Sequence, residues 1–441
     1  MTKPLYLLLI PFLIAALTGC EDSEEISDSQ DASNYAVKMG GIFPFSGALS
    51  SVYGKPLHQS ALLAIKHLAE AGYSVGWVVG DSKSDPYFGV EAARELIEKG
   101  NIQVLIGATS SNVTISIAEQ LTIPNQIPQI SYVSGSYKIT DLPADEGQDF
   151  LFRLVPSDRL QGTVLAKLAF DTGYQRASTL YIDNPYGQSL NEIFAERFTA
   201  LGGTVVAAIP HQELVSSEFQ GGESYQDELQ RANPNFDSEV LVAISYPQHA
   251  KVYLQEAIDN NYFKEFLFVH GTKVENILDT TVGTDKLDGM CGTAPGGEVT
   301  ESTNIFLASY EIEYGEEPTV LYLRHVYDAI IVAGLAAYAA QAIGEEVTPI
   351  IIREYLRRVN DPNGQKVIAG VEGLKRAMKM LDSGLTINYE GASGNVDFDE
   401  NGDVYTPIEI WCYEDGTIKS RELCTVDFDT TQSAQVECNK L

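Results

Sequence analysis

The sequence predicts an α/β fold made of two doubly wound lobes, each built on a parallel sheet. Short apolar runs rich in β-branched residues alternate with longer segments whose apolar residues recur at helical spacing. This alternation occurs in two successive series, which are separated near residues 152–158. Repeated strand–helix units of this kind form parallel sheets with helices on both faces. The 441 residues suffice for about two to three domains.

The first series contains four expected strands and three expected helices. The strands cover 37–43, 75–79, 104–106 and 129–131, and the helices cover 56–71, 90–99 and 112–121. Gly100 and Pro124 mark the ends of the second and third helices. Together these elements form the start of one lobe.

The second series gives the other lobe. Its expected helices cover 161–170, 189–201 and 248–260, and its strands cover 179–182, 204–209, 239–244 and 266–269. Two later helices, 322–343 and 349–359, have no matching strands, so we expect them to return to the first lobe. The tail predicts a turn-rich hairpin over 394–403, a strand over 408–413 and a further hairpin turn at Asp415-Gly416.

Composition excludes one class of partner. The chain has 29 Lys and Arg residues against 61 Asp and Glu residues, for a formal net charge of −32. Because nucleic-acid binding requires a basic surface, we expect no nucleic-acid partner. The same charge would repel an anionic membrane surface.

The first residues resemble a bacterial lipoprotein signal. A basic Lys3 precedes an apolar stretch of residues 5–17, which is too short to span a bilayer, and Leu17-Thr18-Gly19-Cys20 resembles the lipobox. Residues 1–19 are therefore predicted to be removed and Cys20 to be lipidated, which places the protein in the bacterial cell envelope on its periplasmic or extracytoplasmic face. The alternative is an ordinary secretory signal.

An acidic, polar stretch follows, and we interpret residues 20–35 as a disordered tether; the alternative is an acidic interaction tail. An envelope compartment permits disulfides among the four remaining cysteines, which allow three pairings. No C-x-x-C spacing predicts a metal site for them. The cysteines are Cys291, Cys412, Cys424 and Cys438.

Two hydroxyl-rich loops are the strongest candidate binding elements. Ser110 and Ser111 stand between an expected strand and the start of a helix, where free backbone N–H groups and Ser hydroxyls suit an anion such as a carboxylate. Simple N-capping is the alternative. The loop 131–137 follows the next strand and faces the same sheet edge, where open α/β sheets bind ligands.

Catalytic and cofactor motifs are weak. Residues 72–76 match G-x-S-x-G but lead from a helix into a strand, the reverse of a nucleophile elbow. Gly40-Gly41 lacks the dinucleotide-binding signature, so no cofactor is predicted. Asp397 and Asp399 begin a calcium-loop pattern in which Ile408 stands where a bidentate Glu is required. An enzymatic role is therefore not expected.

From about Val37 to Tyr413, the chain resembles the substrate-binding proteins of branched-chain amino acid type ABC transporters, which have the type I periplasmic binding fold. The order and spacing of several short stretches carry this resemblance. They are Gly41-Ile42-Phe43-Pro44-Phe45-Ser46-Gly47, Tyr53-Gly54, Asp81 with Ser84-Asp85-Pro86, Leu105-Ile106-Gly107, Ser110-Ser111, Phe152-Arg153, Pro156-Ser157-Asp158, Gln161-Gly162, Asn184-Pro185-Tyr186-Gly187 and Tyr327-Asp328-Ala329.

The resemblance implies two lobes joined by a hinge of three crossings that close around a ligand. The crossings are expected near 155–157, 293–295 and 391–396. Lobe 1 would then comprise 36–155 plus 296–392, and lobe 2 would comprise 156–294 plus 393–441.

The resemblance also implies a ligand-binding set. Ser110 and Ser111 would hold the ligand carboxylate, Tyr53 would cover the ligand from lobe 1 unless it is a packed core aromatic, and Tyr186 would line the cleft from lobe 2. Family backbone and small side chains meet the ligand at Val133 and Ser134. Ser136 stands beside Gly135, where the family often has Thr. Tyr246 matches a second cleft aromatic, although Ser245 is an alternative equivalent.

One departure leaves the ligand open. Amino-acid-binding members place an acid where this chain has Thr272 or Lys273, to meet the ligand ammonium. An unpaired buried ammonium costs several kcal/mol, so another acid such as Glu275 pairs with it, or the ligand lacks the amine. Lys273 suggests a second anionic group on the ligand, unless it faces solvent.

The sequence thus predicts a membrane-anchored solute-binding protein for an amino acid or related carboxylate, with the subunits of an ABC permease as partners. The alternative is a sensory module that presents the same closing lobes to a signalling receptor.

Overall fold

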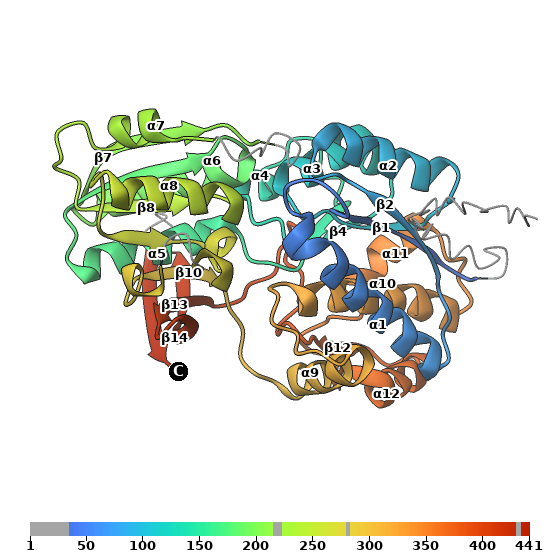
Figure 1. The fold of residues 1–441 in the computed structure, drawn as a ribbon. Helices are drawn as coiled ribbons and strands as arrows, with labels where there is room; N and C mark the ends of the chain where they lie inside the picture. The colour runs from blue at the N-terminus through green and yellow to red at the C-terminus, as the bar shows by residue number, and fades with distance from the viewer. Residues whose placement is uncertain (1–34, 215–222, 279–282, 429–433) are drawn as a thin grey trace, which may run out of the picture.

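A computed structural model describes residues 35–214, 223–278, 283–428 and 434–441. The predicted signal, Cys20 and nearly all of the tether lie outside these residues. Two α/β lobes lie side by side, and three connections pass between them (Figure 1). The predicted α/β class with parallel sheets is confirmed.

Lobe 1 is built on a five-stranded sheet whose neighbouring strands are all parallel, in the order β2-β1-β3-β4-β5. The strands are β1 (Lys38–Phe43), β2 (Gly76–Asp81), β3 (Val104–Ile106), β4 (Gln129–Ser131) and β5 (Leu151–Arg153). The connecting helices are α1 (Lys55–Ala71), α2 (Pro86–Glu98), α3 (Ser111–Ile117) and α4 (Tyr137–Thr140).

A later part of the chain completes lobe 1, as the unpaired helical segments in the sequence predict. Helix α10 packs along α1, and α12 and α9 also contact α1. A two-stranded parallel sheet, β11-β12, accompanies them. These elements are α9 (Glu301–Tyr314), α10 (Leu323–Ala342), α11 (Pro349–Leu356), α12 (Gly370–Asp382), β11 (Gln365–Ile368) and β12 (Ile387–Glu390).

Helix α10 is the one described helix whose length and apolar composition would suffice to cross a membrane. However, 89% of its most apolar window is buried inside the protein. Its composition therefore reflects its place in the core of lobe 1, where it packs against α1 and α11.

Lobe 2 holds an eight-stranded sheet in the order β15-β14-β13-β10-β9-β8-β6-β7. Strands β6 to β10 pair in parallel, whereas β13, β14 and β15 extend the sheet in antiparallel fashion. The strands are β6 (Arg176–Ile182), β7 (Thr204–His211), β8 (Val240–Ile244), β9 (Phe266–Phe268), β10 (Cys291–Pro295), β13 (Ile408–Glu414), β14 (Thr417–Phe428) and β15 (Ala434–Lys440). Its helices are α5 (Asp158–Thr172), α6 (Pro185–Ala200), α7 (Gln226–Ala232) and α8 (Pro247–Asp259).

The crossings lie between β5 and α5, between β10 and α9, and between β12 and β13. The third connection still contacts lobe 1 beyond residue 393, although the sequence predicts that residues from 393 onward belong to lobe 2. Phe398 packs edge-on against Phe152, and Gly402 accepts a backbone hydrogen bond from Arg153 at 2.9 Å. Asp403 pairs with the buried Arg153 side chain. These contacts hold residues 398–404 against β5.

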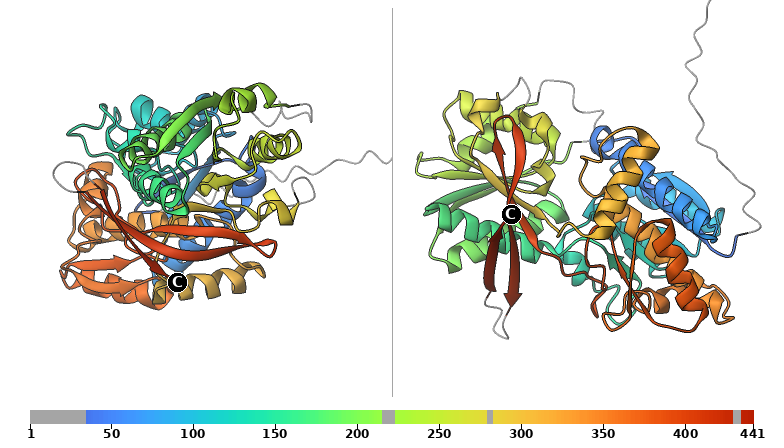
Figure 2. Two further views of the ribbon diagram at one scale, coloured as in Figure 1. Left: turned by 90° about the vertical axis from the view of Figure 1, so that its left-hand side faces the viewer. Right: turned by 90° about the horizontal axis from the view of Figure 1, so that it is seen from below.

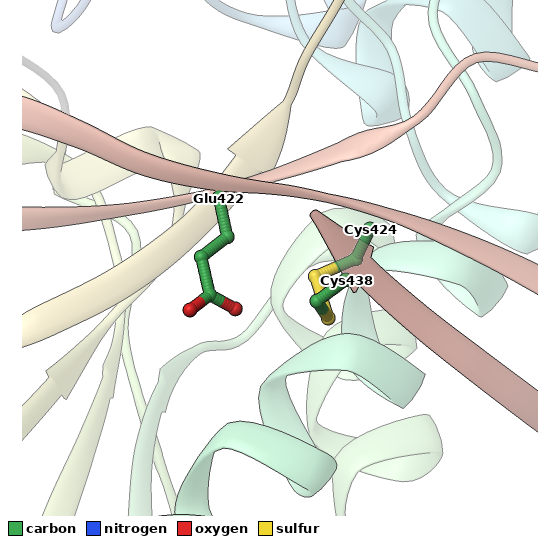
Figure 3. Close-up of side chains that lie close together, drawn as sticks. All are labelled: Glu422, Cys424 and Cys438. Carbon is green, nitrogen blue, oxygen red and sulfur yellow. A yellow bond between two sulfur atoms is a disulfide. The ribbon is translucent and has the colours of Figure 1, made fainter. Parts of the chain in front are cut away.

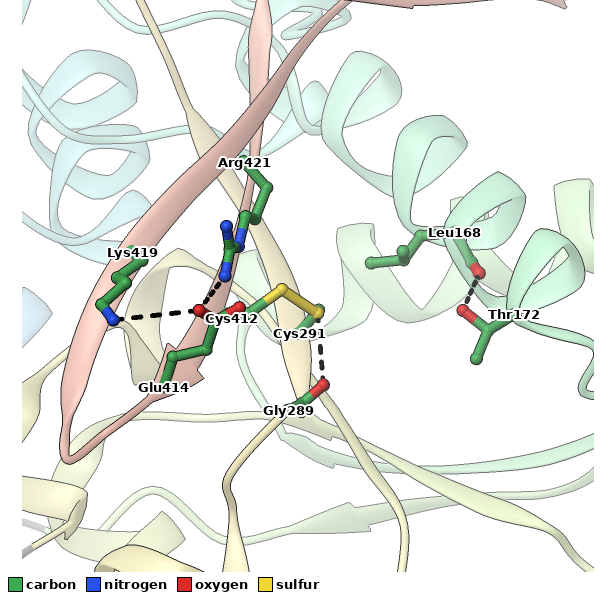
Figure 4. Close-up of a disulfide and its surroundings, with 8 residues drawn as sticks. All are labelled: Leu168, Thr172, Gly289, Cys291, Cys412, Glu414, Lys419 and Arg421. Carbon is green, nitrogen blue, oxygen red and sulfur yellow. Dashed lines mark hydrogen bonds and ion pairs between the residues drawn. A yellow bond between two sulfur atoms is a disulfide. The ribbon is translucent and has the colours of Figure 1, made fainter. Parts of the chain in front are cut away.

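Two disulfides tie the strands of lobe 2 together, and the sequence had left their pairing open. Cys291 bonds Cys412, and Cys424 bonds Cys438. In each bond the two cysteines stand directly opposite one another on adjacent antiparallel strands. Figure 4 shows the first bond beside the ion pair of Glu414 and Arg421. The C-terminal strands thus lie on lobe 2, whereas α9 to α12 lie on lobe 1 (Figure 2).

Candidate functional site

A small cavity lies between the two lobes, at the ends of β3, β4 and β9, and is called the interlobe cavity below. Its volume is about 20 Å³, room for about one water molecule. Lobe 1 contributes the loops after β3 and β4, the helical turn Ser50–Gly54 and the residue before α10. The lining residues are Leu49, Tyr53, Thr109, Ser110, Ser111, Val133, Ser134, Gly135, Tyr186, Tyr246, His270, Gly271 and Tyr322.

Seven of the ten predicted ligand-binding residues line this one cavity, although they come from distant parts of the chain. They are Tyr53, Ser110, Ser111, Val133, Ser134, Tyr186 and Tyr246. Tyr53 is a buried aromatic residue, and it also forms part of the cavity wall.

The other three predicted residues are absent from the cavity wall, and each has a local reason. Ser136 donates to the carbonyl of Pro185 at 3.0 Å and contacts Ser189, so it joins the lobes rather than facing the cavity. Thr272 turns back on its own strand end and donates to the Val269 carbonyl at 2.9 Å.

Lys273 forms a largely buried ion pair with Glu409 of β13, so it neither faces solvent nor reaches the cavity. The tight turn His270–Thr272 causes this shift, because it places His270 and Gly271 at the cavity instead.

The serine loop keeps free hydrogen-bonding capacity. Ser110 occupies the N-cap position of α3 with an extended backbone, but its side chain makes no capping hydrogen bond. The simple capping interpretation therefore does not account for Ser110. Thr114 braces the loop from behind, since its hydroxyl accepts from the Ala108 N–H at 2.9 Å and contacts the Ser134 hydroxyl at 2.8 Å.

Aromatic rings form the opposite wall. Tyr186 and Tyr246 lie face to face with centroids 5.6 Å apart, and His270 lies 4.8 Å from the Tyr186 ring. Burial lowers the pKa of His270 to about 3, so the imidazole is neutral at physiological pH. Its Nδ1 lies 2.6 Å from Oε1 of Gln161. The wall is thus uncharged and largely apolar.

A buried acid lies behind the cavity. Asp158 begins α5, and a Cβ placed on the cavity residue Gly135 would come within 2.5 Å of its Oδ1. The Oδ2 atom has no hydrogen-bond partner among the described residues. Burial raises the pKa of Asp158 to about 8, and the charge of Arg153 only partly opposes this. Glu275, which the sequence suggested as the acid that pairs with a ligand ammonium, is exposed and does not line the cavity.

A second, half-buried acid joins the two lobes beside the cavity. Glu213, in the loop after β7, accepts from Asn112 of α3 at 3.1 Å and from Asn184 at 2.8 Å, both through Oε2. Asn184 in turn reaches the hydroxyl of the cavity residue Tyr246 at 3.4 Å. Burial raises the pKa of Glu213 to about 7.

The chain matches the model of the receptor family ligand binding region over residues 57–415. It belongs to this family. A curated relative, the chemotactic signal transduction system substrate-binding protein BasB of Halobacterium salinarum, is 27% identical over 395 residues, covering 88% of this chain and 89% of the relative.

Solved structures of this family's fold agree with the architecture. A leucine binding protein of Thermotoga maritima superposes with a TM-score of 0.69 at 20% identity, covering 88% of this chain and 99% of its own. A solute binding protein of an ABC transporter from R. palustris, in complex with benzoate, gives 0.65 at 18% identity, covering 88% and 96%. The type I periplasmic binding fold predicted from the sequence is confirmed. These neighbours are solute-binding proteins rather than enzymes.

Lobe 2 holds a group of side chains of the types that bind metal ions. Within the described ranges, one group of potential ligands converges, formed by Glu422, Cys424 and Cys438 (Figure 3). The two sulfur atoms are bonded to each other, so neither is a thiolate that could bind a metal.

Sequence reasoning missed Asp158, His270, Gly271 and Tyr322 as residues of this site. Asp158 stood inside a stretch that carried the family resemblance, but an acid in the first turn of a helix is also an ordinary helix-start feature. Its position directly after the first crossing was the available signal.

Proposed function

We propose that this chain is an extracytoplasmic solute-binding lipoprotein that captures a small amino acid by hinge closure and delivers it to an ABC permease. The observation that carries the proposal is the placement of Asp158, a buried carboxylate with an unpartnered oxygen, behind the serine-lined interlobe cavity. The two ends of an α-amino acid require a site for an anion and a site for a cation, and these loops offer both.

The serine loop supports the anionic end. Ser110 has a hydroxyl that is not used for capping, and Ser111 stands at the first position of α3, where the helix leaves backbone N–H groups without intrahelical partners. Hydrogen bonds from such donors to a carboxylate contribute about 1.5–3 kcal/mol each. A ligand carboxylate bound here would lie on the lobe 1 side of the cavity.

Asp158 supports the cationic end. A buried carboxylate without a partner is costly, and a ligand ammonium beside it would remove that cost. The ligand side chain would then face the wall formed by Tyr186, Tyr246 and Tyr322, which favours an uncharged, apolar group. We therefore infer that the ligand is a neutral α-amino acid.

Lobe movement is part of the proposal. The interlobe cavity is smaller than an amino acid, so the lobes or the aromatic wall must separate for a ligand to enter. Gln248 of α8 donates to the Ala48 carbonyl of lobe 1, and Asn112 donates to Glu213 of lobe 2, so both rims have closing contacts. Ligand binding would favour this closed arrangement, which the permease would recognise.

A sensory role is the second candidate, because BasB is named as a component of a chemotactic signal transduction system and aligns over most of both chains.

In either role we propose that lipidated Cys20 anchors the protein at the membrane. Mass spectrometry of the membrane fraction tests this: we expect a lipid-modified Cys20 at the N-terminus, and a Cys20→Ala variant should be released from the membrane.

A thermal-shift screen tests the ligand assignment. A ligand at a hundredfold excess over its Kd stabilises the bound protein by about 2.7 kcal/mol. We expect a shift with L-leucine, L-isoleucine or L-valine and a smaller or absent shift with 4-methylpentanoate, which is leucine without its amine. Equal shifts with leucine and 4-methylpentanoate would show that Asp158 does not bind an ammonium.

A further inference from the structure

A fully buried arginine lies where the chain first passes between the lobes. Arg153, the last residue of β5, has a side chain with no exposed surface, and it does not line the interlobe cavity. Its guanidinium forms two hydrogen bonds to the carboxylate of Asp403 in the third crossing, from Nε to Oδ1 at 2.6 Å and from Nη2 to Oδ2 at 2.7 Å. Such two-pronged ion pairs fix geometry as well as charge, so Asp403 determines where this guanidinium lies.

The third nitrogen of the guanidinium holds a loop of the interlobe cavity. Nη1 donates to the carbonyls of Gly135 and Ser136, each at 2.9 Å. The backbone N–H of Asp158 donates to the same Gly135 carbonyl at 2.7 Å. Arg153 and Asp158 therefore meet at one oxygen atom of a residue that lines the cavity.

The charge of Arg153 also acts on Asp158. Burial raises the pKa of Asp158 to about 8, and the positive charge of Arg153 opposes this rise. Asp403 carries the negative charge that offsets Arg153. The neighbouring Arg159 is partly exposed and pairs with Asp141. Burial keeps the other titratable side chains of this site uncharged at neutral pH, because it raises the pKa of the tyrosines and lowers that of the histidine: Tyr186 of α6, Tyr246 before α8, His270 after β9 and Tyr322 before α10.

We propose that Arg153 and Asp403 are positioning residues for the ligand ammonium. The pair fixes the loop of Gly135 against Asp158, and the carboxylate of Asp403 sets how strongly the guanidinium charge favours ionised Asp158. Both residues act through Asp158 rather than by contact with the ligand. The inference rests on the proposed role of Asp158 as the partner of that ammonium.

The pH dependence of L-leucine binding tests this inference, because the ammonium binds the ionised form of Asp158. Affinity, measured by calorimetry from pH 6 to pH 9, should rise with pH and reach half of its maximum near the pKa of about 8. Each protein in the series carries Glu213→Gln, which removes the titration of the other carboxylate between the lobes. The readout is the pH at half-maximal affinity, called the midpoint below.

Two variants should move the midpoint in opposite directions. Asp403→Asn removes the negative charge that offsets Arg153, so the pKa of Asp158 should fall and affinity at pH 6.5 should rise severalfold relative to affinity at pH 9. Arg153→Gln/Asp403→Asn removes the guanidinium as well, so the midpoint should rise and the same ratio should fall. The double variant removes both charges of the pair, and it therefore keeps the test valid if Asp403→Asn folds poorly. Circular dichroism and the melting temperature verify that each variant is folded.

A second ion pair supplies a matched control. Arg357 binds Asp149 through two hydrogen bonds of 2.7 and 2.8 Å and donates to the Asp399 carbonyl of the third crossing at 2.7 Å. Neither Arg357 nor Asp149 lines the interlobe cavity. Asp149→Asn therefore breaks a similar pair on the same crossing and should leave the midpoint unchanged.

A pair that only supports the fold would lower affinity by the same factor at every pH when it is broken. Unchanged midpoints in Asp403→Asn and in the double variant would overturn this inference alone, and so would an equal shift in Asp149→Asn. If the rise of affinity with pH persists in Asp158→Asn, the proposed ammonium site and this inference both fail.

Discussion

Asn112 donates from Nδ2 to Oε2 of Glu213 over 3.1 Å, and this hydrogen bond joins the first turn of α3 in lobe 1 to the loop after β7 in lobe 2. Glu213 is half-buried where the two lobes meet, and Asn184 of lobe 2 donates to the same oxygen. The negative charge of Asp85 adds to the effect of burial on the pKa of Glu213. Closure therefore changes the environment of a titratable group.

We predict that this contact makes closure pH-dependent. The pKa of Glu213 rises from an ordinary 4.5 to about 7 in the closed arrangement, so the closed state binds the proton more tightly than the open state. Protonation of Glu213 therefore favours closure. This effect is complete below the pKa that Glu213 has in the open state, and it is lost as pH rises through about 7. The contribution of Glu213 to the affinity for L-leucine, measured by calorimetry, should therefore fall severalfold between pH 6 and pH 8.

Glu213→Gln removes this titration while keeping an acceptor for Asn112. The ratio of wild-type to variant affinity should therefore vary between pH 5.5 and 8, whereas a constant ratio would show that Glu213 does not titrate on closure. The exposed Glu119→Gln serves as the control and should show a constant ratio.

Asp158→Asn should change affinity and stability in opposite directions. Removing one partner of a buried ion pair costs roughly 3–5 kcal/mol, so affinity for L-leucine should fall by about a hundredfold or more. In the ligand-free protein the pKa of Asp158 is raised from 3.8 to about 8, so its ionised form is unfavourable in the fold. The variant should therefore melt higher than the wild type at pH 8.5, and this advantage should vanish near pH 4.

The control for this prediction is a second ligand rather than a second protein variant. Affinity for 4-methylpentanoate should be unchanged or increased in Asp158→Asn, because that ligand has no ammonium to lose its partner. Equal loss of affinity for leucine and 4-methylpentanoate would point to a misplaced loop instead of a lost charge pair.

Much of the sheet architecture was readable from the sequence, because strands and loops follow local patterns. The predicted strands 104–106 and 129–131 coincide with β3 and β4, and Asp415-Gly416 forms the turn between β13 and β14. Helix α12 was missed although its signal was present: its buried residues Leu374, Ala377, Met378 and Leu381 have helical spacing. Helix α9 has a weaker pattern, since Ile312 is 85% exposed.

Only the part of the site that is formed by loops at neighbouring strand ends was predictable from the sequence. Ser110, Ser111 and Ser134 were found in this way, because β3 and β4 are parallel neighbours. The sequence does not distinguish Asp158 from an ordinary acid at the start of a helix. Only the structure places its carboxyl group next to the cavity residue Gly135. Lys273 was misplaced because a single tight turn after β9 decides which residue faces the cavity.

Ser110→Ala separates binding from helix capping. Its hydroxyl makes no capping bond, so the variant should keep the wild-type stability while losing about tenfold or more in affinity for L-leucine, the value of one hydrogen bond to a charged group. Thr348→Ala is the matched control, since Thr348 accepts from the Ile351 N–H and caps α11. It should lose about 1 kcal/mol of stability with affinity unchanged. A stability loss in Ser110→Ala instead would support the capping interpretation.

The two disulfides should differ in their effect on stability, because they close loops of very different length. Cys291 and Cys412 are 121 residues apart, whereas Cys424 and Cys438 are 14 apart. In the chain-entropy model the longer loop contributes about 2 kcal/mol more to the free energy of unfolding. Cys291→Ala/Cys412→Ala should thus destabilise the protein more than Cys424→Ala/Cys438→Ala in denaturant titrations followed by tryptophan fluorescence, to which Trp411, buried in β13, contributes. Both bonds join directly opposed positions on adjacent strands, so the local strand pairing is matched between the two variants. An equal or reversed loss would mean that the connection through α9 to α12 already restricts the unfolded chain, or that the β14–β15 hairpin depends on its disulfide to form.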